Sequence, residues 1–103
     1  MFFILSDFLY KNLLIFALDY DTIIGKLIFR QKRSGDRLKT TKSNGTKTLK
    51  KFFNEKKVSI ACRQRALVAC DGAGILAVEF LGVGERSAVS EDTKRVLLIT
   101  EIQ

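Results

Sequence analysis

The sequence of 103 residues is 47% hydrophobic and 28% charged, which is typical of one small globular domain and not of a disordered chain. It contains no His and only two cysteines, Cys62 and Cys70, so we predict no metal site and no Ser–His or Cys–His catalysis, and expect both thiols to be reduced. The net charge of +7 is uneven, because residues 30–65 carry thirteen Lys and Arg against two acids while both flanking segments are slightly acidic, a pattern typical of polyanion binders.

The apolar segment 1–27 begins MFFILSDFLYKNLLIFALDY. Asp7, Lys11 and Asp19 interrupt it, so its charge-free runs are far shorter than the roughly 20 apolar residues that span a membrane. It also lacks the basic start of a signal peptide, so we expect no membrane association and a cytoplasmic location. A buried helix or strand explains its composition, and we predict a helix over residues 3–18, with an interfacial or partner-binding role as the alternative.

Residues 22–32 (TIIGKLIFRQK) are rich in β-branched and aromatic side chains and predict a strand. The Ser34-Gly35-Asp36 sequence predicts a turn, and residues 40–45 (TTKSNG) predict a loop because they contain no apolar side chain and end in Asn-Gly.

The segment KTLKKFFNEKK predicts an amphipathic helix with Thr46 or Thr48 as its N-terminal cap. Leu49, Phe52 and Phe53 follow the i, i+3, i+4 spacing of a core-facing stripe. The lysines of this segment lie off the stripe, so the helix can be held by its phenylalanines and still present positive charge to solvent or to a ligand.

Ser59 predicts the cap of a second short helix over residues 60–65. The Asp71-Gly72-Ala73-Gly74 sequence predicts a hairpin between strands. The expected strands of this half are residues 67–71, 75–83, 87–90 and 95–102. Strands around a helical pair predict an α+β class, a small mixed-sheet or sandwich-like domain with two short helices.

No motif for catalysis stands out. The glycine pairs at 72–74 and 82–84 match neither of the common phosphate-binding loops, and nothing in the spacing of the carboxylates brings two of them into one apolar site. The basic segment therefore carries the functional prediction. A solubilising surface is the alternative, but a local charge of +11 beside acidic flanks favours polyanion binding. An acid within an arginine cluster, such as Asp36, is expected to accept backbone amides and orient a guanidinium. There is no aromatic RNA-recognition signature, so we expect an RNA to be recognised by its shape and backbone.

Four stretches, FRQKRSGDRLK, GTKTLKKFFNEKKVS, RQRALVACDGAGILAVEFLGVGER and VSEDTKRVLLITEI, occur in this order. Residues 28–103 thereby resemble the C-terminal domain of bacterial tRNA(Ile)-lysidine synthase, which has an R-x-R-x-x-G-D-R turn, a G-T-K-x-L-K-x-x-F helix, a D-G hairpin and a T-K-R-V-L strand. Residues 1–27 do not resemble the family.

The family enzyme uses ATP to attach lysine to the wobble cytidine of an isoleucine tRNA, and its S-G-G-x-D-S ATP-binding loop belongs to a separate catalytic domain. That motif does not occur in these 103 residues. The resemblance therefore implies an accessory domain that helps to hold the tRNA, with no cofactor and no activity of its own. Its implied partners are tRNA and a separately encoded catalytic domain.

The resemblance also assigns positions. Gly35 and Asp36 match the turn, and Gly45, Thr46, Leu49 and Phe53 match the helix. Together with Arg33 and Lys51 from the charge pattern, the matching cations give the predicted tRNA-binding set: Arg30, Lys32, Arg33, Arg37, Lys47, Lys50, Lys51, Arg63, Arg65, Lys94 and Arg95.

The chain departs from the family pattern where it lacks proline. Ser34, Ser59 and Leu67 or its neighbour stand where the family has proline, and Lys32 stands where arginine is usual. These departures lead us to expect a split, truncated or diverged gene product. A protein-interaction module and a non-functional gene remnant are the alternative interpretations.

Overall fold

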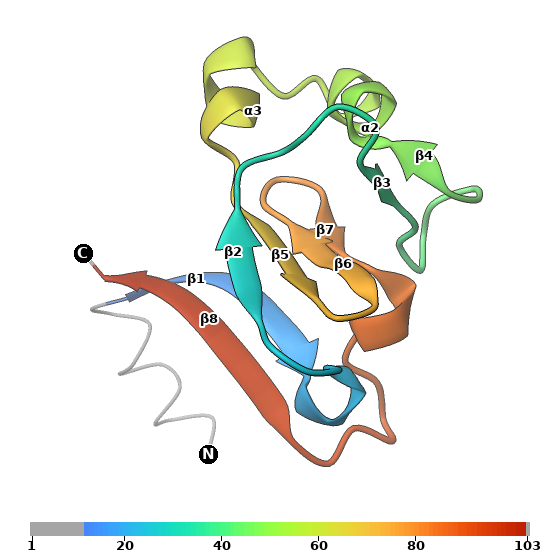
Figure 1. The fold of residues 1–103 in the computed structure, drawn as a ribbon, viewed down its shortest axis with the longest axis vertical. Coiled ribbons are helices and arrows are strands. Elements are labelled where there is room, and N and C mark those ends of the chain that lie inside the picture. Colours follow the sequence, from blue (N-terminus) through green and yellow to red (C-terminus); the bar gives the residue numbers. More distant parts are fainter. Residues whose placement is uncertain (1–11, 103) are drawn as a thin grey trace.

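Three antiparallel sheets and two short helices make up residues 12–102, the part of the chain that the computed structural model describes (Figure 1). The strands are β1 (Asn12–Asp19), β2 (Ile28–Arg30), β3 (Arg37–Leu38), β4 (Lys47–Thr48), β5 (Val68–Asp71), β6 (Gly74–Val78), β7 (Gly82–Val83) and β8 (Val96–Ile102). The helices are α2 (Leu49–Glu55) and α3 (Ile60–Arg65), and two 3-10 turns are η1 (Tyr20–Thr22) and η2 (Glu85–Ser87). The predicted α+β class is confirmed, and every described strand pairing is antiparallel.

A four-stranded sheet in the order β2-β5-β6-β7 forms the centre. The predicted hairpin joins β5 to β6, and the Asp71 carboxylate closes it by accepting the backbone N–H groups of Ala73 and Gly74 at 2.9 and 3.2 Å. Because side chains alternate along a strand, the paired residues Val68 and Val78 face one side of the sheet.

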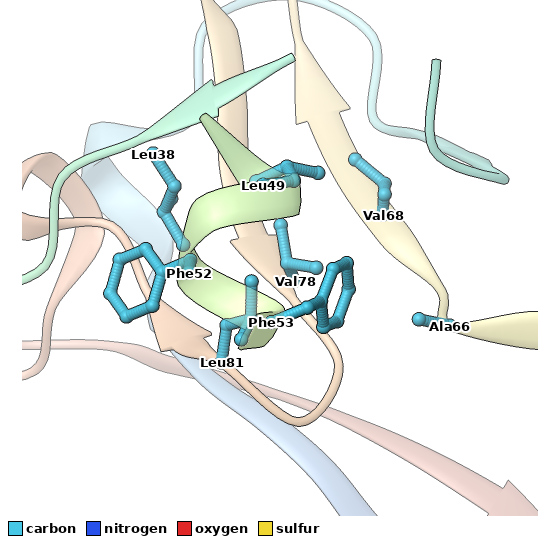
Figure 2. Close-up of a cluster of buried hydrophobic side chains, with 8 residues drawn as sticks. All are labelled: Leu38, Leu49, Phe52, Phe53, Ala66, Val68, Val78 and Leu81. Carbon is cyan, nitrogen blue, oxygen red and sulfur yellow. The ribbon is translucent and has the colours of Figure 1, made fainter. Parts of the chain in front are cut away.

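That side packs against α2 (Figure 2). Leu49, Phe52 and Phe53, the predicted stripe, are each no more than 4% exposed and meet Val68 and Val78 in one apolar cluster. The predicted caps are confirmed as well, since Thr48 accepts the backbone N–H of Lys51 and Ser59 accepts that of Cys62, both at 3.2 Å.

The other side of the sheet packs against a two-stranded ribbon of β1 and β8. Phe16 and Leu18 of β1 are buried there against Ala69 and Ala77 of the central sheet. The small alanine side chains let the ribbon approach closely, and this layer makes the fold sandwich-like.

The helix predicted over residues 3–18 is wrong from Asn12 onwards, where the chain forms β1; residues 3–11 lie outside the described part. The segment is apolar on all sides, and such a run fits a buried strand as well as a helix. Pairing decides between them, because β1 supplies the hydrogen-bonding partner of β8 along its length, from Asn12 opposite Ile102 to Asp19 opposite Val96.

Two predicted strands differ in extent. Of residues 22–32 only Ile28–Arg30 is a strand, because Gly25 turns the chain at φ 70° and Ile24 is tied to the β5–β6 hairpin by its backbone groups. Residues 75–83 divide into β6 and β7 around a turn in which Phe80 has φ 72°.

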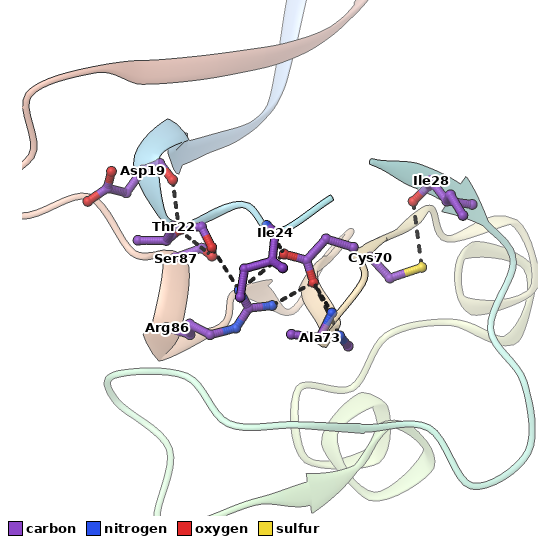
Figure 3. A network of polar contacts seen from close by, with 10 residues as sticks. Asp19, Thr22, Ile24, Ile28, Cys70, Ala73, Arg86 and Ser87 are labelled. Atoms are coloured by element: carbon purple, nitrogen blue, oxygen red, sulfur yellow. Dashed lines mark hydrogen bonds and ion pairs between the residues drawn. The ribbon is translucent and has the colours of Figure 1, made fainter. Parts of the chain in front are cut away.

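The strand predicted over residues 87–90 is not formed; η2 covers Glu85–Ser87. The position of η2 is fixed by the buried Ser87 hydroxyl, which accepts a hydrogen bond from the Thr22 hydroxyl at 2.8 Å (Figure 3).

Candidate nucleic-acid interface

A tight turn at Ser34 and Gly35 joins β2 to β3 and is closed by Asp36. The Asp36 carboxylate accepts hydrogen bonds from both terminal nitrogens of Arg30, at 2.8 and 3.0 Å, and from the backbone N–H of Arg33, at 2.7 Å. Gly35 has φ 88°, a backbone conformation that side chains disfavour. The Arg30 hydrogen bonds hold the pKa of Asp36 below its ordinary value, so the pair stays ionised and its two charges cancel.

The same turn fixes the start of α2. The backbone N–H of Leu49 donates to the Asp36 carbonyl oxygen at 2.9 Å, while Thr48 caps the helix. Because Leu49 is buried, the helix is seated on the core and turns Lys50 and Lys51 outwards, where both are exposed. The turn and the helix therefore form one positioned unit.

A groove of about 500 Å³ lies between this turn and the helices. Lys32 and Arg33 line it from the turn, Lys50 from α2 and Arg63 from α3. Its acid, Asp36, is already neutralised by Arg30. We call this site the basic groove. Its three exposed cations, Lys32, Arg33 and Lys50, leave a net positive charge free to meet a ligand.

Arg63 has a second role within the basic groove. Its Nε and Nη2 donate to the Val58 carbonyl at 3.2 and 2.6 Å, and its Nη1 donates to the Asn54 side chain at 2.8 Å. Its guanidinium lies 5.6 Å from the centre of the Phe53 ring. Arg63 thus holds the connection between α2 and α3 in shape while adding its charge.

A smaller depression of about 270 Å³ lies beside α2 and includes Lys42, Lys47 and Lys56. Lys47 pairs with Glu55 at 2.6 Å and lies 5.4 Å from the centre of the Phe52 ring. Lys42 and Lys56 are exposed cations outside the predicted set. The charge run contained the signal for them, but only the fold shows that they share a surface with Lys47.

The structure does not bring the rest of the predicted set to the basic groove. Arg37 lies exposed on β3, and Arg65 lines a different groove. Lys94 and Arg95 precede β8, whose start lies at the end of the long axis away from α2 (Figure 1). Arg95 is engaged there, because it pairs with Asp21 and stacks 4.6 Å from the centre of the Tyr20 ring.

Within residues 12–102, no group of three or more His, Cys, Asp or Glu side chains is arranged to hold a metal ion. No helix in the same range is long and apolar enough to cross a membrane. Cys62 and Cys70 are both free thiols. The features that gather at the basic groove are thus charge and shape, which suit the binding of a phosphate backbone.

Comparison with known families identifies the domain. Residues 27–99 match the family described as the TilS substrate C-terminal domain. The chain belongs to this family. In the solved crystal structure of a TilS C-terminal domain, the same fold recurs with a TM-score of 0.67 and 30% sequence identity, covering 84% of this chain and 68% of that one.

Several tRNA(Ile)-lysidine synthases are similar to the chain. That of Clostridium tetani is 28% identical over 94 residues, which are 91% of this chain and 20% of the synthase. That of Bacillus cereus is 35% identical over 86 residues, 82% of this chain and 18% of the synthase. The chain thus spans about a fifth of the length of these two relatives, and the similarity concerns their TilS C-terminal region.

Proposed function

We propose that this chain is a tRNA-binding module of the lysidine synthase family that works in the cytoplasm and contributes recognition, not chemistry, to the reaction of a catalytic domain. The observation that carries the proposal is the basic groove, in which three exposed cations from the turn and α2 surround a self-neutralised Arg30–Asp36 pair. The membership of the TilS C-terminal family supports tRNA as the polyanion.

The groove suits a phosphate backbone better than a single small anion. Its exposed cations come from separate elements, Lys32 and Arg33 from the turn and Lys50 from α2, so successive phosphates can be met by the three side chains. Arginine offers paired donors to a phosphate, and lysine a mobile point charge. Because Arg63 and Asp36 hold the walls in place, little ordering is needed on binding, and this favours affinity.

The proposal predicts salt-sensitive binding of a labelled tRNA(Ile) transcript by the full chain, measured by fluorescence anisotropy. The logarithm of the association constant should fall linearly with the logarithm of salt concentration, by roughly 0.7–0.9 for each phosphate neutralised. The double variant Arg33→Ala/Lys50→Ala should weaken binding and lower this slope, with the midpoint of urea unfolding unchanged.

A matched control removes the same charge elsewhere. Lys26→Ala/Lys39→Ala also deletes two exposed cations, both outside the basic groove and outside the predicted tRNA-binding set, and should leave the affinity and slope near those of the unmodified chain. Equal losses in the two double variants, or a binding constant that does not respond to salt, would contradict the proposal.

A further inference from the structure

A second groove, of about 850 Å³, opens between the end of α3, β2 and the β1–β8 ribbon. We call it the aromatic groove, because Phe29 of β2 and Phe80 of the β6–β7 turn line it and are 42% and 44% exposed. Arg65, Glu79 and Glu101 add charge to its walls. Two half-exposed phenylalanines in one hollow differ from the scattered apolar side chains of an ordinary surface.

Phe80 adopts an unfavourable backbone conformation at this site. Its φ of 72° lies in the left-handed region, where a bulky residue is a genuine outlier and glycine is not. The ring is half exposed, so burial in the core does not compensate for the strain. Strained residues of this kind concentrate at binding sites, where the surrounding structure holds them for a purpose.

The aromatic groove adjoins the basic groove along two elements. In α3, Arg63 lines the basic groove and Arg65, two residues later, lines the aromatic one. In β2, Phe29 lines the aromatic groove, and the next residue, Arg30, holds the turn of the basic groove through Asp36. An RNA strand that follows the phosphate contacts of one groove is thereby led into the other.

Arg65 is exposed and poised for a ligand. Its side chain makes a weak hydrogen bond to the Cys62 sulfur at 3.6 Å, and no carboxylate within residues 12–102 lies within ion-pair distance of it. Glu79, by contrast, is engaged, because one of its carboxylate oxygens accepts the backbone N–H of Leu67 at 3.1 Å.

We propose that the aromatic groove binds an unpaired nucleotide next to the helical RNA that the basic groove holds, an inference that rests on the proposed function. Bases of any sequence can stack on phenylalanine rings, and a guanidinium beside the stack binds the phosphate. Glu101 and the other carboxylate oxygen of Glu79 repel phosphate from their own side of the groove and accept hydrogen bonds from exocyclic amino groups. The groove should therefore prefer cytosine or adenine to uracil.

Three RNA hairpins with one common duplex test this proposal on the full chain: a blunt hairpin, one with a three-cytidine 3′ overhang and one with a three-uridine overhang. We expect anisotropy titrations to show tighter binding of the cytidine overhang than of the blunt hairpin, with the uridine overhang between them. Phe80→Gly should remove most of this difference, which corresponds to roughly 5- to 150-fold for each stacked base.

Phe80→Gly also separates binding from folding. Glycine relaxes the backbone at φ 72°, so the variant should bind the overhang less tightly while its urea midpoint rises. If Phe80 had only a structural role, the variant would lose overhang binding and stability together. Phe29→Ala, on an exposed strand position, provides a second removal of one stacking surface.

The outcomes distinguish the two proposals. Arg33→Ala/Lys50→Ala should weaken all three hairpins and preserve the overhang effect. If wild type binds the blunt hairpin in a salt-dependent way but gains nothing from either overhang, or if both phenylalanine variants keep the gain, the aromatic groove proposal is overturned and the proposed function stands. It is likewise overturned if these variants alter self-association in sedimentation but leave RNA binding unchanged. Binding that requires the overhang and survives Arg33→Ala/Lys50→Ala supports the aromatic groove and contradicts the basic one.

Discussion

Two aspartate–arginine pairs lie at opposite ends of the β2–β5 strand pair and serve different purposes. Asp36 binds Arg30 through two hydrogen bonds of 2.8 and 3.0 Å, and Asp71 binds Arg86 through two of 3.1 and 2.8 Å. Beside the first pair, exposed cations line the basic groove. The second lies within a network of protein groups (Figure 3).

The difference lies in what surrounds each carboxylate. The Asp71 side chain is fully buried, and it also accepts the backbone N–H groups of Ile24, Ala73 and Gly74, while Arg86 donates to the Thr22 carbonyl. This network ties the segment after β1 to the central hairpin. An arginine of equal formal charge thus ties distant segments together in one place and orders the turn beside the basic groove in the other.

Asp71→Asn should give the largest effect on stability. Asparagine keeps one acceptor oxygen but loses the charge that holds Arg86 and three backbone amides, so we expect the free energy of unfolding to fall by about 2–3 kcal/mol. Urea denaturation followed by circular dichroism measures this. Asp92→Asn, at an exposed position, should change stability by less than about 0.5 kcal/mol. Equal effects at the two positions would contradict the structural role assigned to Asp71.

The pH dependence of stability should also reflect the contribution of the Asp71 carboxylate. Burial alone would raise the pKa of Asp71, but the hydrogen bonds from Arg86, Ile24 and Ala73 outweigh it and lower the pKa from 3.8 to about 2. A depressed pKa stabilises the folded state at pH values above the pKa that Asp71 has in the unfolded chain. This contribution, about 2 kcal/mol, disappears as the pH falls from about 4 towards 2. Urea midpoints measured across that range should fall steeply for wild type and less steeply for Asp71→Asn; parallel slopes would refute this origin.

Asp36→Asn should cost less, about 1–2 kcal/mol, because the asparagine oxygen can still accept the Arg33 backbone amide and because the pair is partly open to solvent. The same urea titration measures it. A loss as large as that of Asp71→Asn would remove the distinction between the two pairs, and the double variant should then be compared with the sum of the single ones.

The elements that the sequence predicts correctly are those determined by local chemistry. Thr48 and Ser59 cap their helices, Leu49, Phe52 and Phe53 face the core, and the Asp71–Gly74 turn joins two strands. Each of these depends on residues within one or two turns of chain, where spacing and side-chain type decide the outcome.

The elements that the sequence misses depend on distant partners or on a backbone conformation that the residue type does not indicate. The apolar run that becomes β1 has no helical or strand periodicity of its own and is set by β8. The break between β6 and β7 occurs at Phe80, where the sequence has no glycine to indicate a left-handed turn.

The site could likewise be predicted only in part from the sequence. The charge run located the basic segment, but the family resemblance placed Arg95, which is bound to Asp21, in the same predicted set as Arg33, which is exposed in the basic groove. Only the fold separates cations that protein groups already engage from those left for a ligand.

The β1–β8 ribbon has a consequence for how the chain folds. It pairs Asn12 with Ile102, so almost the whole described chain must be closed into a loop before these strands meet. Contacts of such long sequence separation are costly in entropy and slow folding, whereas the β5–β6 hairpin and α2 form from neighbouring residues. Until the ribbon closes, β8 is an apolar strand with unpaired hydrogen-bonding groups on both edges. The protein concentration during folding therefore decides whether β8 pairs first with β1 or with another molecule.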